Sequence, residues 1–285
     1  MSEVLIDEGM LAIEEWLTAN FGLVFTGARR LVLANRLQSR MHTLAMTSSF
    51  EYFMLLRSAR NAAETNLLID AVTNGETYFF REEDQMSALL DLRKQRTDRG
   101  DLHVLSAGCS TGEEAYTLAI VLGEGLPGVR VNVDAIDIDP LRLAKAKAAR
   151  YEERSMRMVA PEQRQRYLQR GEDAAYYVRE PYRANVSFKR ANLIEASSLH
   201  VARPYDAIFC RNVLIYFSEE AFDAALASLA EWLTPGGLLF LGHSESIVGR
   251  TPAFRTERLG NCIAYRRTED PATVSFTPIR AFACG

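Results

Sequence analysis

Two segments, LHVLSAGCSTGEEAYTLA (102–119) and VRVNVDAIDIDP (129–140), constrain the fold of this chain more than any other part of it. The first predicts a buried strand, a loop of small residues and the start of a helix, and the second predicts a strand that ends in acidic residues. Together they are typical of half of a nucleoside-binding unit. The loop lets backbone atoms approach a ligand, and Asp137 can accept hydrogen bonds from the two hydroxyls of a ribose.

The glycine spacing of the loop narrows the choice of cofactor. Gly108 and Gly112 are spaced G-x-x-x-G, not G-x-G-x-x-G, and the chain has no phosphate-binding G-x-x-x-x-G-K-[ST] segment. The helix opens with Glu113 and Glu114, whose carboxylates would repel a pyrophosphate. S-adenosylmethionine fits better, because it has a ribose, no phosphate and a positively charged sulfonium.

Helix capping offers a second explanation for some of these acids. The pairs Ser110-x-x-Glu113 and Thr111-x-x-Glu114 match capping boxes, so Glu114 could serve the helix alone. Asp139 precedes Pro140, which is typical of an N-cap followed by proline at the first helical position. We therefore assign Asp139 a structural function and expect Asp137 to be the ribose ligand.

The rest of the chain predicts an α/β protein with a helical N-terminal part. Residues 1–72 contain helical patterns, and alternation of strands and helices begins near residue 102, which indicates a mostly parallel sheet covered on both faces. FRTERLGNCIAYRR predicts a final antiparallel hairpin around Gly260, as in class I methyltransferases. The alternation is interrupted between 151 and 190, where a small antiparallel β sub-domain is expected. The domains are thus 1–72, 73–267 with the insertion 151–190, and a tail, 268–285.

Composition limits the possible partners. The net charge of −4 gives no general attraction for nucleic acid, and we expect no nucleic-acid partner. The start of the chain lacks the pattern of a signal peptide, and no apolar run approaches the ~18 residues of a membrane span, so a cytoplasmic protein without membrane insertion is expected. Four cysteines without C-x-x-C spacing are expected to be isolated thiols, and the four scattered histidines predict no metal site.

Four stretches together resemble the CheR family of chemotaxis receptor glutamate methyltransferases: TNGETYFFRE (73–82), SAGCSTGEEAYTLA (106–119), AIDIDP (135–140) and DAIFCRNVLIYF (206–217). The resemblance implies an all-α N-terminal domain and a Rossmann-like class I methyltransferase domain that carries a small β sub-domain. It also implies methyl transfer from S-adenosylmethionine to glutamates on the cytoplasmic helices of chemoreceptors. The products would be glutamate methyl esters, formed in chemosensory adaptation, and S-adenosylhomocysteine. A monomer is expected.

The resemblance also implies roles for individual residues. Glu114 would contact the amino-acid end of the cofactor and Asp137 its ribose, whereas Asn192 and Leu193 would line the adenine. Thr77 and Arg81 would lie over the cofactor and Tyr216 near its methyl group, with Arg81 and Tyr216 as the catalytic residues. Asn74 stands one position earlier than the Asn of many members, and we expect it to make a turn. The full set of expected cofactor contacts is Gly75, Thr77, Arg81, Ala107, Glu114, Asp137, Asn192, Leu193, Arg211 and Asn212.

The implied chemistry needs no general base, because a glutamate is already ionised at neutral pH. The protein has to desolvate the carboxylate and align it with the methyl group. Arg81 is suited to orient a carboxylate through paired N–H donors, and Tyr216 could orient either reactant with its hydroxyl. The alternatives are that Tyr216 only packs as an aromatic and that Arg211 is a surface arginine at a strand end.

Arg29, Arg36 and Arg40 lie near one face of a predicted helix, which we place opposite an apolar stripe formed by Leu33, Leu37, Met41 and Leu44. They are either a solvated face or a docking surface for acidic receptor helices. Two other functions remain open: a methyltransferase that acts on another protein or a small molecule, and a non-catalytic sensor of the cofactor.

Overall fold

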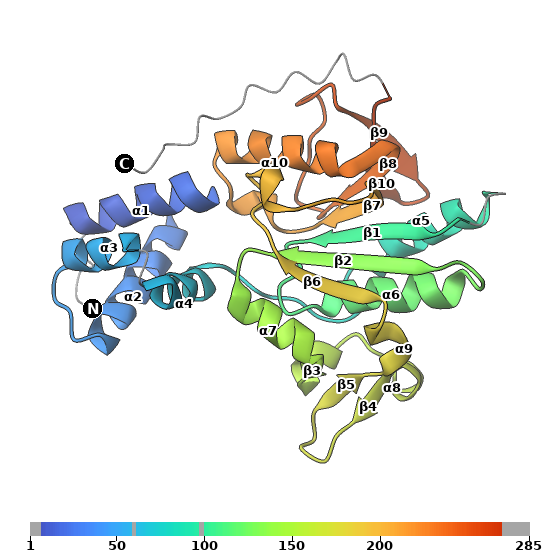
Figure 1. The fold of residues 1–285 in the computed structure, drawn as a ribbon, viewed down its shortest axis with the longest axis horizontal. Helices are drawn as coiled ribbons and strands as arrows, with labels where there is room; N and C mark the ends of the chain where they lie inside the picture. The colour runs from blue at the N-terminus through green and yellow to red at the C-terminus, as the bar shows by residue number, and fades with distance from the viewer. Residues whose placement is uncertain (1–6, 59–60, 97–99, 270–285) are drawn as a thin grey trace.

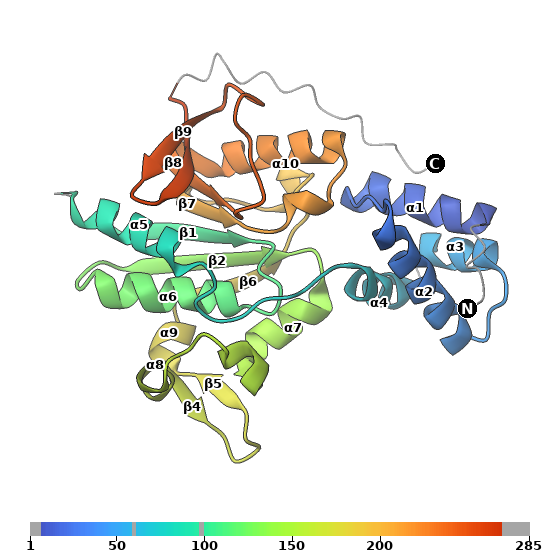
Figure 2. The ribbon, with the colours of Figure 1, turned by 180° about the vertical axis from the view of Figure 1, so that it is seen from behind.

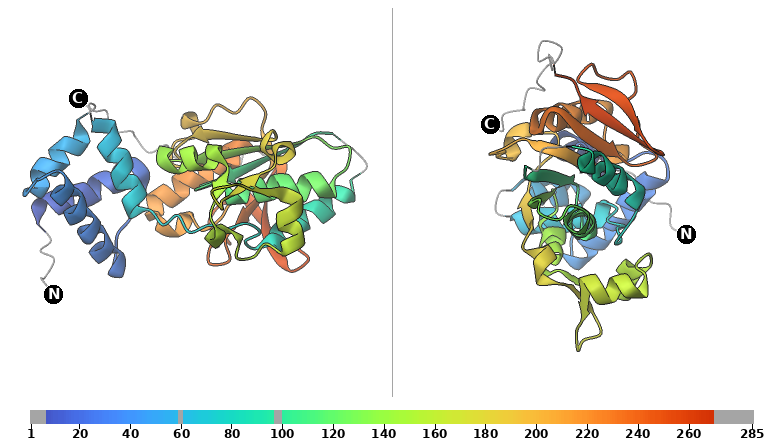
Figure 3. Two further views of the ribbon diagram at one scale, coloured as in Figure 1. Left: turned by 90° about the horizontal axis from the view of Figure 1, so that it is seen from below. Right: turned by 90° about the vertical axis from the view of Figure 1, so that its right-hand side faces the viewer.

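The computed structural model describes residues 7–58, 61–96 and 100–269 (Figure 1). Residues 1–6, most of the predicted tail (270–285) and Cys284 lie outside the described residues. The N-terminal domain contains helices α1 (Glu8–Phe21), α2 (Ala28–Thr43), α3 (Ser49–Arg57) and α4 (Ala62–Val72). Figure 3 shows this domain beside the sheet-containing domain, with the chain crossing between them after α4. The predicted helical start of the chain is confirmed.

The first two helices follow local signals in the sequence. The Asp7 side chain caps α1 by accepting from the Met10 N–H at 2.8 Å, and Gly22 ends the helix in the left-handed conformation, with φ 72°. Leu33 and Leu37 of α2 are buried as predicted. Leu44 is not part of this stripe, because it lies beyond the last residue of α2 and is exposed.

The large domain contains a seven-stranded sheet in the order β6-β2-β1-β7-β8-β10-β9, in which β10 runs antiparallel to both of its neighbours and the other described strand pairs are parallel. The predicted mostly parallel Rossmann-like sheet and its final hairpin are confirmed. Adjacent parallel strands bring their carboxyl ends to one edge of the sheet. The strands are β1 (Leu102–Ala107), β2 (Val131–Asp137), β6 (Val186–Arg190), β7 (Tyr205–Cys210), β8 (Leu233–Leu241), β9 (Phe254–Leu259) and β10 (Cys262–Arg267).

Apolar side chains on both faces of the sheet form two core layers, as expected for a parallel sheet covered by helices. Val104 of β1 packs with α5, α6 and α7, whereas the next residue, Leu105, packs with α10. Figures 1 and 2 show α6 and α10 on opposite sides of the sheet. These helices are α5 (Glu83–Lys94), α6 (Glu113–Gly125), α7 (Pro140–Ala148) and α10 (Glu219–Trp232), and the single-turn helices nearby are η3 (Ala196–Ser198) and η4 (Leu214–Tyr216).

The predicted β sub-domain is present as a three-stranded antiparallel sheet in the order β3-β5-β4. Its predicted end at residue 190 is wrong, because β6 belongs to the large sheet, where Val186 pairs with Val133 of β2. The sub-domain contains β3 (Arg150–Tyr151), η2 (Glu153–Met156), α8 (Pro161–Tyr167), β4 (Leu168–Arg170), β5 (Tyr176–Val178) and α9 (Glu180–Arg183).

Backbone contacts join the N-terminal domain to the large domain. The Val24 N–H donates to the Tyr216 carbonyl and the Ser218 N–H donates to the Gly22 carbonyl, both at 2.9 Å. The junction therefore lies against the segment that follows β7. Among the described residues, no helix combines the length and apolar character required to cross a membrane.

Candidate active site

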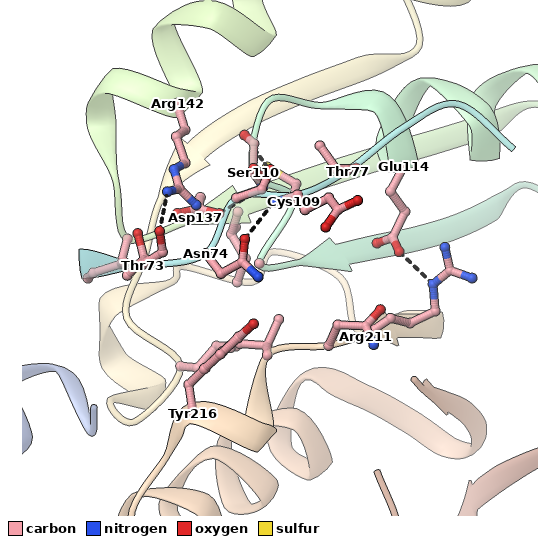
Figure 4. A pocket seen from close by; sticks show the side chains of 18 of the residues that line it. Thr73, Asn74, Thr77, Cys109, Ser110, Glu114, Asp137, Arg142, Arg211 and Tyr216 are labelled. Carbon is pink, nitrogen blue, oxygen red and sulfur yellow. Dashed lines mark hydrogen bonds and ion pairs between the residues drawn. The ribbon is translucent and has the colours of Figure 1, made fainter. Parts of the chain in front are cut away.

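A pocket opens at the carboxyl ends of β1, β2 and β7, beside the N-terminal domain (Figure 4). The space between its lining residues, which includes open solvent, amounts to about 1030 Å³. Ala107 is an exception among the predicted contacts, because its side chain is buried in the core under the pocket. The predicted site residues that line the pocket are Gly75, Thr77, Arg81, Glu114, Asp137, Asn192, Leu193, Arg211, Asn212 and Tyr216.

The loop between β1 and α6 forms the floor of the pocket. Gly108 has a φ of 79°, and a Cβ at this position would lie 2.4 Å from a methyl group of Val213. Asp137 accepts hydrogen bonds from the N–H groups of Ser110 at 2.8 Å and Asp139 at 2.9 Å. Burial raises the pKa of Asp137, and these two bonds oppose the rise. Asp137 thus braces the loop, a structural function that sequence reasoning missed.

The capping-box interpretation of the two glutamates is wrong. The N-cap of α6 is Gly112, which has no side chain to cap with. Glu113 points away from the pocket and accepts from the hydroxyls of Thr111 at 2.6 Å and Ser155 at 2.8 Å. Glu114 lines the pocket.

Glu114 and Arg211, which both line the pocket, form a buried ion pair (Figure 4). The Arg211 Nε donates to Glu114 at 2.7 Å, and the other nitrogens donate to the carbonyls of Arg81 at 2.8 Å and Glu82 at 3.1 Å. The Arg211 side chain is only 3% exposed. It is therefore not the surface arginine of the alternative interpretation. It joins β7, α6 and the segment before α5.

The segment 73–78 forms the roof of the pocket. Asn74 accepts from the Glu76 N–H at 3.2 Å, so the predicted turn is present. The Arg142 guanidinium lies under Gly75 and donates to the Thr73 carbonyl at 2.8 Å. A Cβ on residue 75 would lie 2.5 Å from the guanidinium carbon, so a larger residue there would displace Arg142. No role was predicted for Arg142 from the sequence. Its position three residues after the N-cap Asp139 was a usable signal, because residues with this spacing lie side by side on a helix and can pair.

The N-cap assignment of Asp139 is confirmed. Its carboxylate accepts from the Leu141 N–H at 2.8 Å and pairs with Arg142 at 3.1 Å. Burial raises the pKa of Asp139 to about 6. Unlike Asp137, it does not line the pocket. Within the described residues, no three His, Cys, Asp or Glu side chains gather closely enough to hold a metal ion, and Cys109, Cys210 and Cys262 are free thiols.

Arg81 and Tyr216 come to the pocket from different elements. Arg81 precedes α5 and is held by the Glu76 carbonyl, to which it donates at 3.0 Å. Tyr216 belongs to η4, and the Arg29 guanidinium lies 4.6 Å from its ring centroid. Tyr216 also packs against the helical domain. Its position is therefore compatible both with orienting a reactant through its hydroxyl and with packing only as an aromatic side chain.

The three arginines of α2 that were considered for docking do not share one environment. Arg40 pairs with the buried Glu64 at 2.6 Å, and Arg29 covers Tyr216; Arg36 is exposed. The placement opposite the apolar stripe was wrong: at about 100° per residue, Arg40 lies next to the stripe that contains Leu37. Only Arg36 extends to the solvent in the way that the docking hypothesis assumed.

Two family models match this chain, and the boundary between them coincides with the boundary between the helical domain and the large domain. The family model described as "CheR methyltransferase, all-alpha domain" matches residues 8–73, and "CheR methyltransferase, SAM binding domain" matches residues 75–262. The chain is 38% identical over 248 residues to a chemotaxis protein methyltransferase of Klebsiella aerogenes, covering 85% of this chain and 84% of that one. A protein of the same name from Escherichia coli K12 is 36% identical over 248 residues, covering 85% of each chain.

Similar solved structures are more distant. Magnesium protoporphyrin IX methyltransferase from Synechocystis PCC 6803 is 14% identical, covers 94% of this chain and 100% of that chain, and has a TM-score of 0.39. The rRNA methyltransferase aviRa from Streptomyces viridochromogenes is 16% identical, covers 68% of this chain and 87% of that chain, and has a TM-score of 0.46.

Proposed function

The chain belongs to the CheR methyltransferase family, and we propose that it transfers methyl groups from S-adenosylmethionine to glutamate side chains on the cytoplasmic helices of chemoreceptors. The reaction takes place in the cytoplasm and yields glutamate methyl esters and S-adenosylhomocysteine. The observation that carries this proposal is the pocket at the carboxyl ends of parallel strands, which is lined by the carboxylates of Glu114 and Asp137 and by Arg81 and Tyr216.

The donors and acceptors in the pocket fit this cofactor. Asp137 is the last residue of β2 and would accept from the ribose hydroxyls, while Glu114 would hold the cationic amino group. Asn192 and Leu193 offer a polar and an apolar side for adenine. No phosphate is expected, because carboxylates line the floor where a pyrophosphate would lie. When bound, the cofactor supplies a methyl group activated by a positive sulfonium.

The protein contributes orientation and exclusion of water. The substrate glutamate is ionised at neutral pH and attacks without a base. Arg81 orients the incoming carboxylate with its N–H groups, and the hydroxyl of Tyr216 holds the reactants in line. The roof formed by 73–78 limits the access of water to the reacting atoms.

The first prediction concerns the product. Incubation with S-adenosylmethionine labelled in its methyl group and a receptor cytoplasmic fragment should label the receptor, and mild alkali should release the label as methanol, because the product is a carboxyl ester. A receptor fragment with its glutamates changed to glutamine is the control and should stay unlabelled. Label that survives alkali, or that appears on another molecule, would contradict the proposed function.

The second prediction concerns Arg81. Arg81→Ala should lower turnover by about 100-fold and change the affinity for S-adenosylhomocysteine by less than about threefold, because its function is at the reacting carboxylate. Steady-state rates and calorimetric titration measure the two effects. Arg250→Ala is a matched control, since both arginine side chains are 26% exposed and Arg250 pairs with Asp223, outside the pocket lining. Equal losses of turnover and affinity would identify Arg81 as a cofactor ligand instead.

The third prediction concerns receptor docking, for which we propose Arg36 as the exposed contact on α2. Arg36→Glu should raise the KM for the receptor by about fivefold or more at low salt and leave cofactor affinity unchanged, because a docking charge acts on association. Arg57→Glu, on the exposed surface of α3, changes the net charge equally and should leave the KM unaltered. An unchanged KM in Arg36→Glu would show that α2 presents only a solvated face.

A further inference from the structure

A buried carboxylate, Glu245, lies behind the turn that carries Tyr216. It follows β8 and is 8% exposed. It accepts hydrogen bonds from the N–H groups of Asn212 at 2.8 Å, Val213 at 3.0 Å, Leu214 at 2.7 Å and Ile215 at 3.3 Å. Four successive N–H groups of one turn therefore converge on a single side chain.

These N–H groups need a partner. The first N–H groups of a helical turn have no acceptor within the turn, and leaving them buried and unpaired is unfavourable. Asn212 adopts a left-handed conformation, with φ 59°, at the start of the turn. A carboxylate satisfies such donors better than a neutral group, because its two oxygens offer several acceptor sites and carry charge.

A second contact fixes Glu245 itself. Its carboxylate also accepts from the Gly242 N–H at 2.8 Å, which ties it to the end of β8. Burial raises the pKa of Glu245 and the backbone N–H groups lower it. The carboxylate is thus held between the ends of two adjacent strands, β7 and β8, and its charge is stabilised by backbone dipoles.

The turn that Glu245 holds is one wall of the pocket. Asn212, Val213 and Tyr216 all line the pocket, and Val213 packs against Gly108 of the floor. The Tyr216 N–H donates to the Val213 carbonyl at 3.2 Å, so a displacement of Val213 moves Tyr216 as well. A change in the carboxylate therefore reaches the tyrosine through the backbone.

We propose that Glu245 is a positioning residue that sets the place of Tyr216 for methyl transfer. This proposal rests on the proposed function, since it assigns Glu245 a part in that reaction. Glu245 does not appear among the residues that line the pocket, and it acts through the backbone of residues 212–215. No role was predicted for it from the sequence.

The test uses Glu245→Gln in the full-length protein. Glutamine keeps the shape of the side chain, but it has one oxygen, and its NH₂ group would face N–H donors. We expect kcat on the receptor fragment to fall about 10- to 100-fold, because small misplacements in an active site have effects of this size. We expect the Kd for S-adenosylhomocysteine to change less than about threefold.

A double-mutant cycle with Tyr216→Phe separates positioning from general destabilisation. If Glu245 acts through Tyr216, Glu245→Gln should lower kcat by less than about threefold in the Tyr216→Phe background. Asp134→Asn is the control for the loss of a carboxylate that accepts several hydrogen bonds. Asp134 accepts from Tyr205 at 2.7 Å and from Lys189 at 3.2 Å, and it does not line the pocket. It should lower the melting temperature without changing kcat.

The outcomes distinguish this role from the proposed function. Unchanged kcat, equal losses of kcat and cofactor affinity, or full additivity with Tyr216→Phe would overturn the role of Glu245. Absence of base-labile methylation by the wild-type protein would overturn the proposed function, and this role with it. If Glu245→Gln yields too little folded protein, Glu245→Asp serves the same cycle, because it keeps the charge but is one methylene shorter.

Discussion

Replacement of Arg211 by methionine is expected to lower the free energy of unfolding by about 3–5 kcal/mol. Methionine fills a similar elongated space, so the effect comes from the loss of charge and hydrogen bonds. Glu114 would remain largely buried without its cation, and among the described residues its remaining hydrogen bond would be the one from the Ser106 hydroxyl at 2.6 Å. The carbonyls of Arg81 and Glu82 would lose their donors as well.

Urea denaturation followed by circular dichroism measures this effect. Arg203→Met is the control, because the Arg203 side chain is 51% exposed and is separated by 4.0 Å from the carboxylate of Asp206, with which it pairs. Its stability should change by less than about 0.5 kcal/mol. If Arg211→Met were as stable as this control, the Glu114–Arg211 pair would not hold β7, α6 and the segment before α5 together.

The double variant Arg211→Met with Glu114→Gln refines the interpretation. Removing both charges leaves no unpaired buried ion, so the double variant should regain part of the stability lost in Arg211→Met. A double variant that is less stable than either single variant would show that the two residues stabilise the fold independently.

The features that the sequence predicted are those with local signals. The β1 strand, its glycine loop and the strand that ends at Asp137 are contiguous patterns of burial and turn residues. The N-cap at Asp139 and the hairpin around Gly260 rest on pairs of adjacent residues. Parallel strands place their carboxyl ends together, so the position of the pocket could be predicted once the strands were recognised.

The features that were missed depend on contacts between distant residues. Arg211 and Glu114 are 97 positions apart, and no pattern in either segment shows that they pair. Glu245 accepts from residues about 30 positions earlier, through backbone groups that have no sequence signature. Arg40 was expected on a solvated or receptor-docking face, and its pairing with Glu64 was missed because Glu64 lies on another helix.

The capping boxes show how a local pattern can match and still be wrong. Ser110 and Thr111 have the required spacing to Glu113 and Glu114, but Gly112 adopts a φ of 93° and becomes the N-cap. The helix therefore begins later than the boxes require. The glutamate side chains are free to take other partners, which for Glu114 places its carboxylate in the pocket.

Asp137→Asn is expected to weaken the binding of S-adenosylhomocysteine by about 1.5–3 kcal/mol, the contribution of hydrogen bonds to a charged group. This corresponds to a roughly 10- to 150-fold increase in Kd. The asparagine oxygen can still accept from one of the N–H groups of Ser110 and Asp139, but the NH₂ group cannot accept from the other. The fold should therefore persist, with a stability loss of about 1 kcal/mol.

Asp139→Asn is the matched control for this prediction. Asparagine is as good an N-cap as aspartate, so α7 should remain capped, and position 139 does not line the pocket. Calorimetric titration should give this variant a Kd within about threefold of the wild-type value. If Asp137→Asn bound as tightly as wild type and Asp139→Asn did not, the ribose contact would belong to Asp139. Loss of affinity in Asp137→Asn alone would mean that one carboxylate both braces the glycine loop and binds the cofactor, so that the loop is held in its binding conformation before the cofactor arrives.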